Sequence, residues 1–220
     1  DAVTSQATLE WRRHDFERAS ILLDAATRLS RESGESDGLR RVAMTRGLLE
    51  TERGNFDAAL EHLARAESIA RELGDSDSVR SALHDQAVVH LRCSRPDRAL
   101  ELFEATEAIS RRRRDPVALA TDLTSQADLH AKAGRIETAL ARLTEAEALS
   151  RSTGDATAQR TVAMALATTH MRAGDLDRAR AVLAEAHVAS EKVGDRAGAA
   201  DALAMEAEIA ETAGDVDSAT

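Results

Sequence analysis

The chain has 220 residues, of which 43% are hydrophobic and 31% charged, and only 2% are aromatic. Its net charge of -10 argues against a nucleic-acid-binding surface, which depends on clustered Lys and Arg. The single cysteine, Cys93, excludes an intrachain disulfide framework, and the sequence has neither a signal-peptide core nor an apolar stretch that could cross a bilayer. We therefore expect a cytoplasmic protein without a membrane partner, and the excess of Arg over Lys favours a bacterial source.

A four-residue motif recurs every 40 residues along the chain, with an acid in second place and alanine in fourth place in all six copies. Its copies begin at Phe16, Phe56, Pro96, Ile136, Leu176 and Val216. Two further series share the period. One consists of Gly34, Gly74, Arg114, Gly154 and Gly194, and the other of His14, Gly54, Ser94, Gly134, Gly174 and Gly214. A fixed period of roughly 20 to 50 residues is typical of stacked arrays, so we predict a solenoid.

Each unit is predicted to contain two antiparallel helices joined by short loops. In the second unit these helices are expected at residues 37–53 and 56–73, and their equivalents follow every 40 residues. Asp115 and Pro116 form the clearest helix start, with a capping carboxylate followed by a proline in the first turn. Gly74 is expected to end a helix in the left-handed conformation.

We predict one repeat domain over residues 1–220, with about five full repeats and a partial sixth. The predicted units are 1–36, 37–76, 77–116, 117–156, 157–196 and 197–220. The last unit is expected to have a first helix at 197–213 and only the start of a second helix at Val216. Leu203, Ala207 and Ile209 would then lack cover, so we expect a fragment of a longer protein whose open end frays or forms a homodimer.

Small residues in register identify the repeat type. They form three series: Ala7, Gly47, Ala87, Ala127, Ala167 and Ala207; Ala19, Ala59, Ala99, Ala139, Ala179 and Ala219; and Ala26, Ala66, Thr106, Ala146 and Ala186. Large residues stand between the last two series, at Leu23, Leu63, Phe103, Leu143 and Leu183. This arrangement resembles the tetratricopeptide repeat, in the elongated form found in kinesin light chains and LuxR-type regulatory ATPases. The resemblance implies an all-α, right-handed superhelical solenoid, and a HEAT-type solenoid is the alternative.

The sequence carries no recognisable catalytic, cofactor or metal site. His90, His130 and His170 are in register, but equivalent residues of stacked helices lie about 10 Å apart, too far to share one zinc ion. We expect structural histidines with a ring nitrogen hydrogen-bonded between helices. The glycines are not clustered into a phosphate loop, and no Gly-x-Ser-x-Gly elbow occurs. We therefore predict that the chain is not an enzyme and has no cofactor, with a cryptic enzyme as an alternative.

The resemblance implies that the first helix of each unit lines a concave groove in which a partner binds. The matching groove positions are Arg41, Met44, Leu48, His84, Val88, Leu91, Arg92, Thr124, Asp128, Lys132, Met164, Thr168, Met171 and Arg172. A floor of Met, Leu and Val with a basic edge suits an amphipathic or acidic peptide. The Lys and Asn residues with which related chaperone-binding repeats hold a C-terminal carboxylate are missing from these positions.

These features together predict a protein- or peptide-interaction module of a bacterial signalling or transcription-regulatory protein. The resemblance to LuxR-type regulators implies that such an array receives a partner and controls domains elsewhere. The alternative is an array that senses a small-molecule inducer. A small-molecule sensor would show a thermal shift with such a molecule, whereas a scaffold would respond only to a polypeptide.

Overall fold

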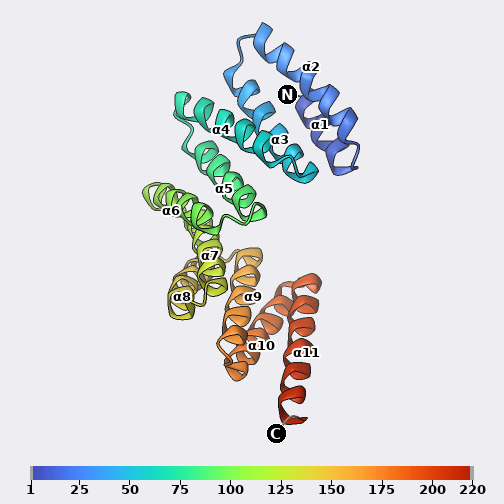
Figure 1. The fold of residues 1–220 in the computed structure, drawn as a ribbon. Coiled ribbons are helices and arrows are strands. Elements are labelled where there is room, and N and C mark those ends of the chain that lie inside the picture. Colours follow the sequence, from blue (N-terminus) through green and yellow to red (C-terminus); the bar gives the residue numbers. More distant parts are fainter. Residues whose placement is uncertain (1, 219–220) are drawn as a thin grey trace. The chain divides into compact units, whose positions relative to one another are not determined.

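The computed structural model of the protein describes the backbone of residues 2–218 and, except at 192, 193 and 212–218, their side chains. Within these residues the chain forms eleven α-helices and no strand, which confirms the predicted all-α class. The helices are α1 (Ala2–Arg12), α2 (Phe16–Glu32), α3 (Ser36–Arg53), α4 (Phe56–Glu72), α5 (Ser76–Arg92), α6 (Pro96–Arg113), α7 (Pro116–Lys132), α8 (Ile136–Thr153), α9 (Ala156–Arg172), α10 (Leu176–Val193) and α11 (Arg196–Ser218) (Figure 1). None of these helices is long and apolar enough to span a bilayer.

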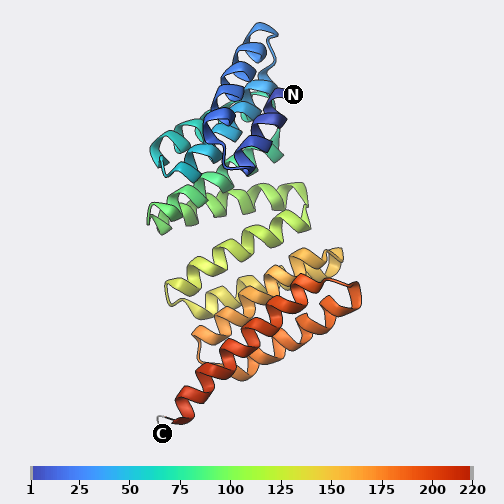
Figure 2. The same cartoon turned by 90° about the vertical axis from the view of Figure 1, so that its right-hand side faces the viewer.

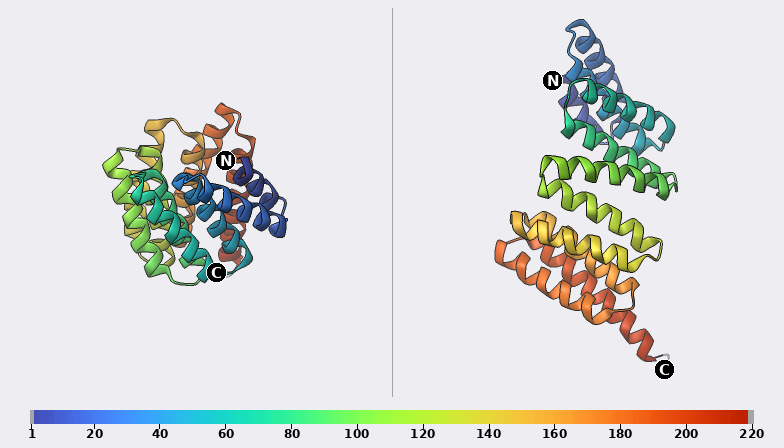
Figure 3. Two further views of the ribbon diagram at one scale, coloured as in Figure 1. Left: turned by 90° about the horizontal axis from the view of Figure 1, so that it is seen from above. Right: turned by 90° about the vertical axis from the view of Figure 1, so that its left-hand side faces the viewer.

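The helices divide into two compact units, one ending at Ile109 and the other beginning at Ser110. The boundary falls inside α6. Each unit is an array of antiparallel helices connected by tight turns (Figure 3). The predicted single-domain organisation and the boundaries of its 40-residue units stay predictions, and the two compact units are described separately below.

The helix ends follow the caps that the sequence indicates. Asp115 Oδ1 accepts a hydrogen bond of 3.0 Å from the N–H of Ala118, and Pro116 occupies the first turn of α7. Two turn positions adopt the left-handed conformation although they hold no glycine. Arg114, in the series of Gly34 and Gly74, has φ of 54°, and Ser94, in the series of Gly54 and Gly134, has φ of 56°. A left-handed non-glycine residue costs on the order of 1 kcal/mol, which the packing of the flanking helices must offset.

Small residues allow the two helices of each repeat to approach closely. Gly47 of α3 lies so near α4 that an added Cβ would be 2.5 Å from Leu63 Cγ. Ala87, Ala127 and Ala167 occupy the same place in α5, α7 and α9 and are fully buried. The large residues between the small ones are also buried, at Leu23, Leu63, Phe103, Leu143 and Leu183. The three-series pattern of the sequence is therefore the helix-packing pattern of the structure.

The odd-numbered helices form the inner layer of each unit. In the first unit α3 contacts both α1 and α5, and in the second unit α9 contacts both α7 and α11. Among the described residues, no Cα atom of α2 comes within 8 Å of one in α4, and the same holds for α8 and α10. Because only the odd-numbered helices bring their backbones close to those of their equivalents, they lie on the more tightly curved side of each unit. This is the side on which the sequence predicted the groove.

The end of the array differs from the prediction. α11 is one uninterrupted helix that passes through Gly214 and Val216, so the expected break after residue 213 is wrong (Figure 2). In earlier repeats a second helix packs back on the first, whereas none of the described residues packs back on α11. Of the three residues expected to lack cover, Leu203 is 50% exposed and Ala207 is exposed, but Ile209 is fully buried. Ile209 packs into the cluster of Ala167, Ala179 and Leu183, which explains its burial.

Candidate functional site

All the predicted groove residues lie on odd-numbered helices, and the structure gathers them into one set in each unit. The first set contains Arg41, Met44 and Leu48 on α3 and His84, Val88, Leu91 and Arg92 on α5. The second set contains Thr124, Asp128 and Lys132 on α7 and Met164, Thr168, Met171 and Arg172 on α9. Within each set the two helices are direct neighbours. Arg92, Lys132 and Arg172 are exposed, and all the others are half-buried.

Several of these side chains take part in helix packing. Met164 and Met171 pack against the buried cluster that contains Ala167 and Leu183, and Met44 packs against the equivalent cluster in the first unit. The ring of His84 lies edge-on to that of Phe103, with 5.3 Å between the centroids. These residues support the inner face, and much of their surface is therefore withdrawn from a partner.

In each unit an open face is formed by residues spaced four, three and four apart on the odd-numbered helices α3 and α5 or α7 and α9, a spacing that keeps them on one side of their helix. We call this face the inner stripe. It consists of Arg41, Thr45, Leu48 and Glu52 on α3; Ser81, Asp85, Val88 and Arg92 on α5; Thr121, Ser125, Asp128 and Lys132 on α7; and Thr161, Ala165, Thr168 and Arg172 on α9. All sixteen are half-buried or exposed. The sequence did not single out Thr45, Asp85, Ser125 and Ala165 as members of this face.

The basic edge predicted for the groove is partly neutralised by the chain itself. Arg92 reaches back to α3, where it donates to the carbonyl of Thr51 at 3.2 Å and pairs with Glu52 at 2.8 Å. Lys132 pairs with Asp128 on the same helix at 2.6 Å. Arg172 has no acidic side chain within ion-pair distance among the residues that the structure describes. Of the predicted cations, Arg172 is therefore the one most available to an acidic partner.

Asp85 gives the first unit an unusual group on the inner stripe. Burial raises the pKa of its carboxyl from 3.8 to about 6, an effect that nearby Arg80 opposes. A carboxyl that titrates near neutrality can lose its proton when a cationic or hydrogen-bond-donating partner approaches. Sequence reasoning missed Asp85 because an aspartate in an amphipathic helix is ordinarily solvated, and its burial depends on the neighbouring helices.

The three histidines in register have separate surroundings. His130 Nδ1 accepts a hydrogen bond of 2.9 Å from Arg135 Nε in the turn before α8. His90 and His170 both have a lowered pKa, for which burial is the main cause. His90 Nδ1 is buried without a hydrogen-bond partner among the described residues, so the expected hydrogen bond is missing there. No three potential metal ligands come together in the described part of the chain.

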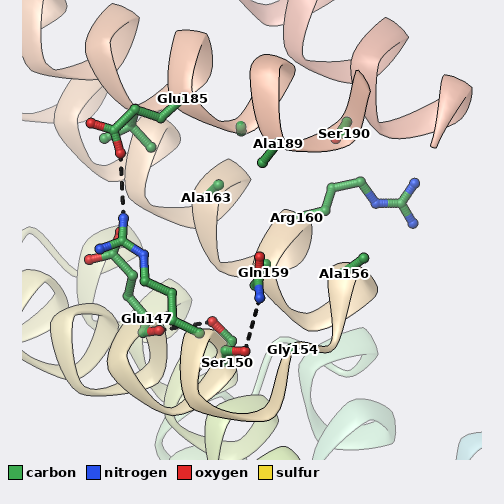
Figure 4. Close-up of a pocket in the computed structure, with 13 residues that line it drawn as sticks. Glu147, Ser150, Gly154, Ala156, Gln159, Arg160, Ala163, Glu185, Ala189 and Ser190 are labelled. Atoms are coloured by element: carbon green, nitrogen blue, oxygen red, sulfur yellow. Dashed lines mark hydrogen bonds and ion pairs between the residues drawn. The ribbon is translucent and has the colours of Figure 1, made fainter. Parts of the chain in front are cut away.

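A cavity of about 300 Å³ lies on the other side of the second unit, between α8, α9 and α10 (Figure 4). Arg151 lines the cavity and pairs with Glu147 at 2.9 Å and with Glu185 at 3.4 Å. Gln159 Nε2 donates to the carbonyl oxygen of Ser150 at 3.2 Å. These polar groups of the cavity therefore find their ion-pair and hydrogen-bond partners within the cavity lining.

Comparisons with known proteins give matches in structure alone. No protein-family model matches the chain, and no curated protein matches it in sequence. A solved STAND signal-transduction ATPase with a tetratricopeptide-repeat sensor, from Pyrococcus horikoshii, superimposes with a TM-score of 0.77 at 20% identity. The match covers 93% of this chain and 31% of the ATPase. The chain has the tetratricopeptide-repeat fold.

Two further structures show the same tetratricopeptide-repeat arrangement. The repeats of a putative kinesin light chain from Podospora anserina match with a TM-score of 0.70 at 16% identity, over 88% of this chain and 95% of theirs. A Rap protein complexed with Competence and Sporulation Factor matches with a TM-score of 0.68 at 18% identity, over 93% of this chain and 60% of that protein. The predicted resemblance to kinesin light chain repeats is thus confirmed at the level of the fold.

Proposed function

We propose that the chain is a protein- or peptide-interaction module of a bacterial regulatory protein and that its partner binds along the inner stripe. The proposed role is binding without catalysis, in the cytoplasm. The proposal includes no nucleic acid, membrane or cofactor. Self-association through α11 stays a prediction.

One observation carries this proposal: a position of the inner stripe varies in chemistry between repeats, whereas the packed position beside it does not. At the packed small position the chain has Gly47, Ala87, Ala127 and Ala167, whereas the inner-stripe position one residue later holds Leu48, Val88, Asp128 and Thr168. The buried positions keep one chemistry because the helix spacing requires it. This inner-stripe position changes from repeat to repeat on a constant scaffold, as a surface that recognises an irregular partner would.

The hydroxyl groups of the inner stripe favour a peptide partner. Ser125 and Thr168 donate to the carbonyl oxygens four residues earlier, at 3.1 and 2.8 Å. Thr45, Thr121 and Thr161 make the same kind of bond. Each hydroxyl then has acceptor capacity left for a donor outside the helix. A peptide backbone supplies such N–H donors at regular intervals, and its apolar side chains could bury against Leu48 and Val88.

The structural neighbours support the regulatory part of the proposal. The Rap structure is a complex with Competence and Sporulation Factor, and the repeats of the STAND ATPase are described as a sensor. Another neighbour, the quorum sensor NprR from B. thuringiensis, matches over 94% of this chain with a TM-score of 0.73. We infer a comparable sensing or docking role for the present repeats.

The proposal is tested by selecting peptides from a random library on the immobilised chain and measuring their affinities in solution. Val88→Glu and Thr168→Glu place a charge on the inner stripe of each unit. Ile21→Glu is the matched control, because Ile21 is 66% exposed on α2, outside the inner layer. We expect at least one inner-stripe variant to lose the selected peptides while I21E retains them. Equal losses in all three variants, or a selection that yields no specific peptide, would refute the proposal.

A further inference from the structure

An ion pair between successive even-numbered helices recurs in the second unit. Arg111 of α6 pairs with Glu145 of α8 at 2.9 Å, and forty residues later Arg151 of α8 pairs with Glu185 of α10 at 3.4 Å. Figure 4 shows Glu185, which lines the cavity, joined by a dashed line to this guanidinium. The equal spacing makes these two pairs one feature of the repeat.

The first unit breaks this feature in a specific way. The register of 40 residues places Arg31 of α2 and Arg65 of α4 at the positions of the paired Arg and Glu. Arginine therefore stands where the second unit has glutamate. Among the described residues, neither Arg31 nor Arg65 has an acidic side chain within ion-pair distance. The first unit therefore has two arginines, Arg31 and Arg65, at positions where the second unit has an arginine and a glutamate.

These two arginines line a cavity of about 270 Å³ between α2, α3 and α4. Arg46 and His62 also line it, and its other lining residues are Asp24, Thr27, Leu39, Val42 and Ala43. The one acid in the lining is Asp24, which is already paired with Arg46. In a chain with a net charge of -10, this cavity carries three arginines against one aspartate.

The positive charge of these arginines affects the pKa of His62. Its pKa is lowered, first by burial and next by Arg46, and Arg65 contributes in the same direction. Glu61 and Glu50 oppose the effect. His62 can therefore report on any change of charge in the cavity.

We propose that this cavity binds an oxyanion of the phosphate class, which bridges Arg31 and Arg65 in place of the missing glutamate. A phosphoryl group offers several strong acceptor oxygens, and guanidinium groups bind such oxygens in paired hydrogen bonds. The volume leaves room for a small molecule attached to the phosphoryl group. None of the residues that line the cavity belongs to the inner stripe, so the site is separate from that stripe and independent of the proposed partner.

The test compares inorganic phosphate with chloride at constant ionic strength. We expect phosphate to raise the melting temperature and, in NMR titrations, to raise the pKa of His62, because the bound anion offsets the field of the arginines. Arg65→Glu restores the ion pair of the other repeats and should weaken phosphate binding about tenfold or more. Arg28→Glu is the control, since it makes the same charge change at an exposed position of α2 outside the cavity lining.

The outcomes are distinct. A response to phosphate that R65E abolishes and R28E keeps would support the site. Titration with glycerol phosphate distinguishes the two possible ligands. If glycerol phosphate binds more tightly than inorganic phosphate, the site recognises a phosphorylated small molecule, and if both bind equally, it recognises the phosphate group alone. The proposal would be overturned if His62 titrated identically in chloride and in phosphate. It would also be overturned if R28E lost as much affinity for phosphate as R65E.

Discussion

Arg92 of α5 pairs with Glu52 of α3, one repeat earlier, with 2.8 Å between Nη2 and Oε1. The two residues hold the same position in successive repeats, so the contact links neighbouring inner helices directly. It also occupies a cation that the sequence assigned to partner binding. The inner stripe of the first unit is consequently less basic than the row of Arg and Lys suggests.

Removing this pair should affect binding more than stability. Both side chains are more than 40% exposed, and solvent screens such pairs, so we expect Glu52→Gln to lower the free energy of unfolding by less than about 1 kcal/mol. The freed guanidinium should strengthen binding of acidic peptides selected on the chain. Urea unfolding and peptide titrations measure the two effects. A large loss of stability, or no gain for acidic over neutral peptides, would contradict this interpretation.

Asp85 should make stability depend on pH. Its pKa is about 6 in the folded chain and 3.8 ordinarily, so the folded state binds more protons between these values. Its contribution to the free energy of unfolding is therefore largest below pH 4, falls as the pH rises towards 6 and then stays level. We expect Asp85→Asn to stabilise the protein at pH 7 by about 3 kcal/mol and by much less at pH 4.

Urea unfolding at several pH values measures this difference. His90 and His170 act in the opposite direction, because their lowered pKa values reduce stability as the pH falls below 6.5. Subtracting the wild-type curve from the D85N curve removes their contribution. Asp97→Asn is the matched control at an exposed position. A difference curve for D85N as flat as that for D97N would show that Asp85 is not the group responsible.

Met164 and Met171 should behave as supporting residues of the core. Both are half-buried and pack against the cluster that contains Leu183 and Ile209. A glutamate there would place a charge in an apolar contact, so we expect Met164→Glu to cost roughly 2 to 4 kcal/mol. Thr168→Glu, on the inner stripe of the same helix, should cost under about 1 kcal/mol. Thermal melts followed by circular dichroism compare the stability of the two variants. Equal stability would show that Met164 belongs to the open surface and not to the core.

The sequence predicted the parts of the fold that repeat. Asp115 caps α7, Ser94 takes the left-handed turn position, and Gly47 marks a close helix contact, because each depends on local geometry that the period imposes. The inner stripe was predicted less well. Which side of a helix stays open depends on the tilt of its neighbours, and so neither the core packing of Met164 nor the burial of Asp85 could be predicted from spacing alone.

Ala167 and Ala207 provide a matched test of the end of the array. They occupy the same place in successive repeats, yet Ala167 is fully buried against α10 and Ala207 is exposed on α11. Overpacking a close helix contact with a larger side chain costs about 1 to 3 kcal/mol or more, so Ala167→Leu should be clearly destabilising. Ala207→Leu should leave the free energy of unfolding within about 0.5 kcal/mol of the wild type. Urea denaturation of the two variants measures the difference, and a cost at Ala207 equal to that at Ala167 would mean that a further helix or a second copy covers α11 in solution.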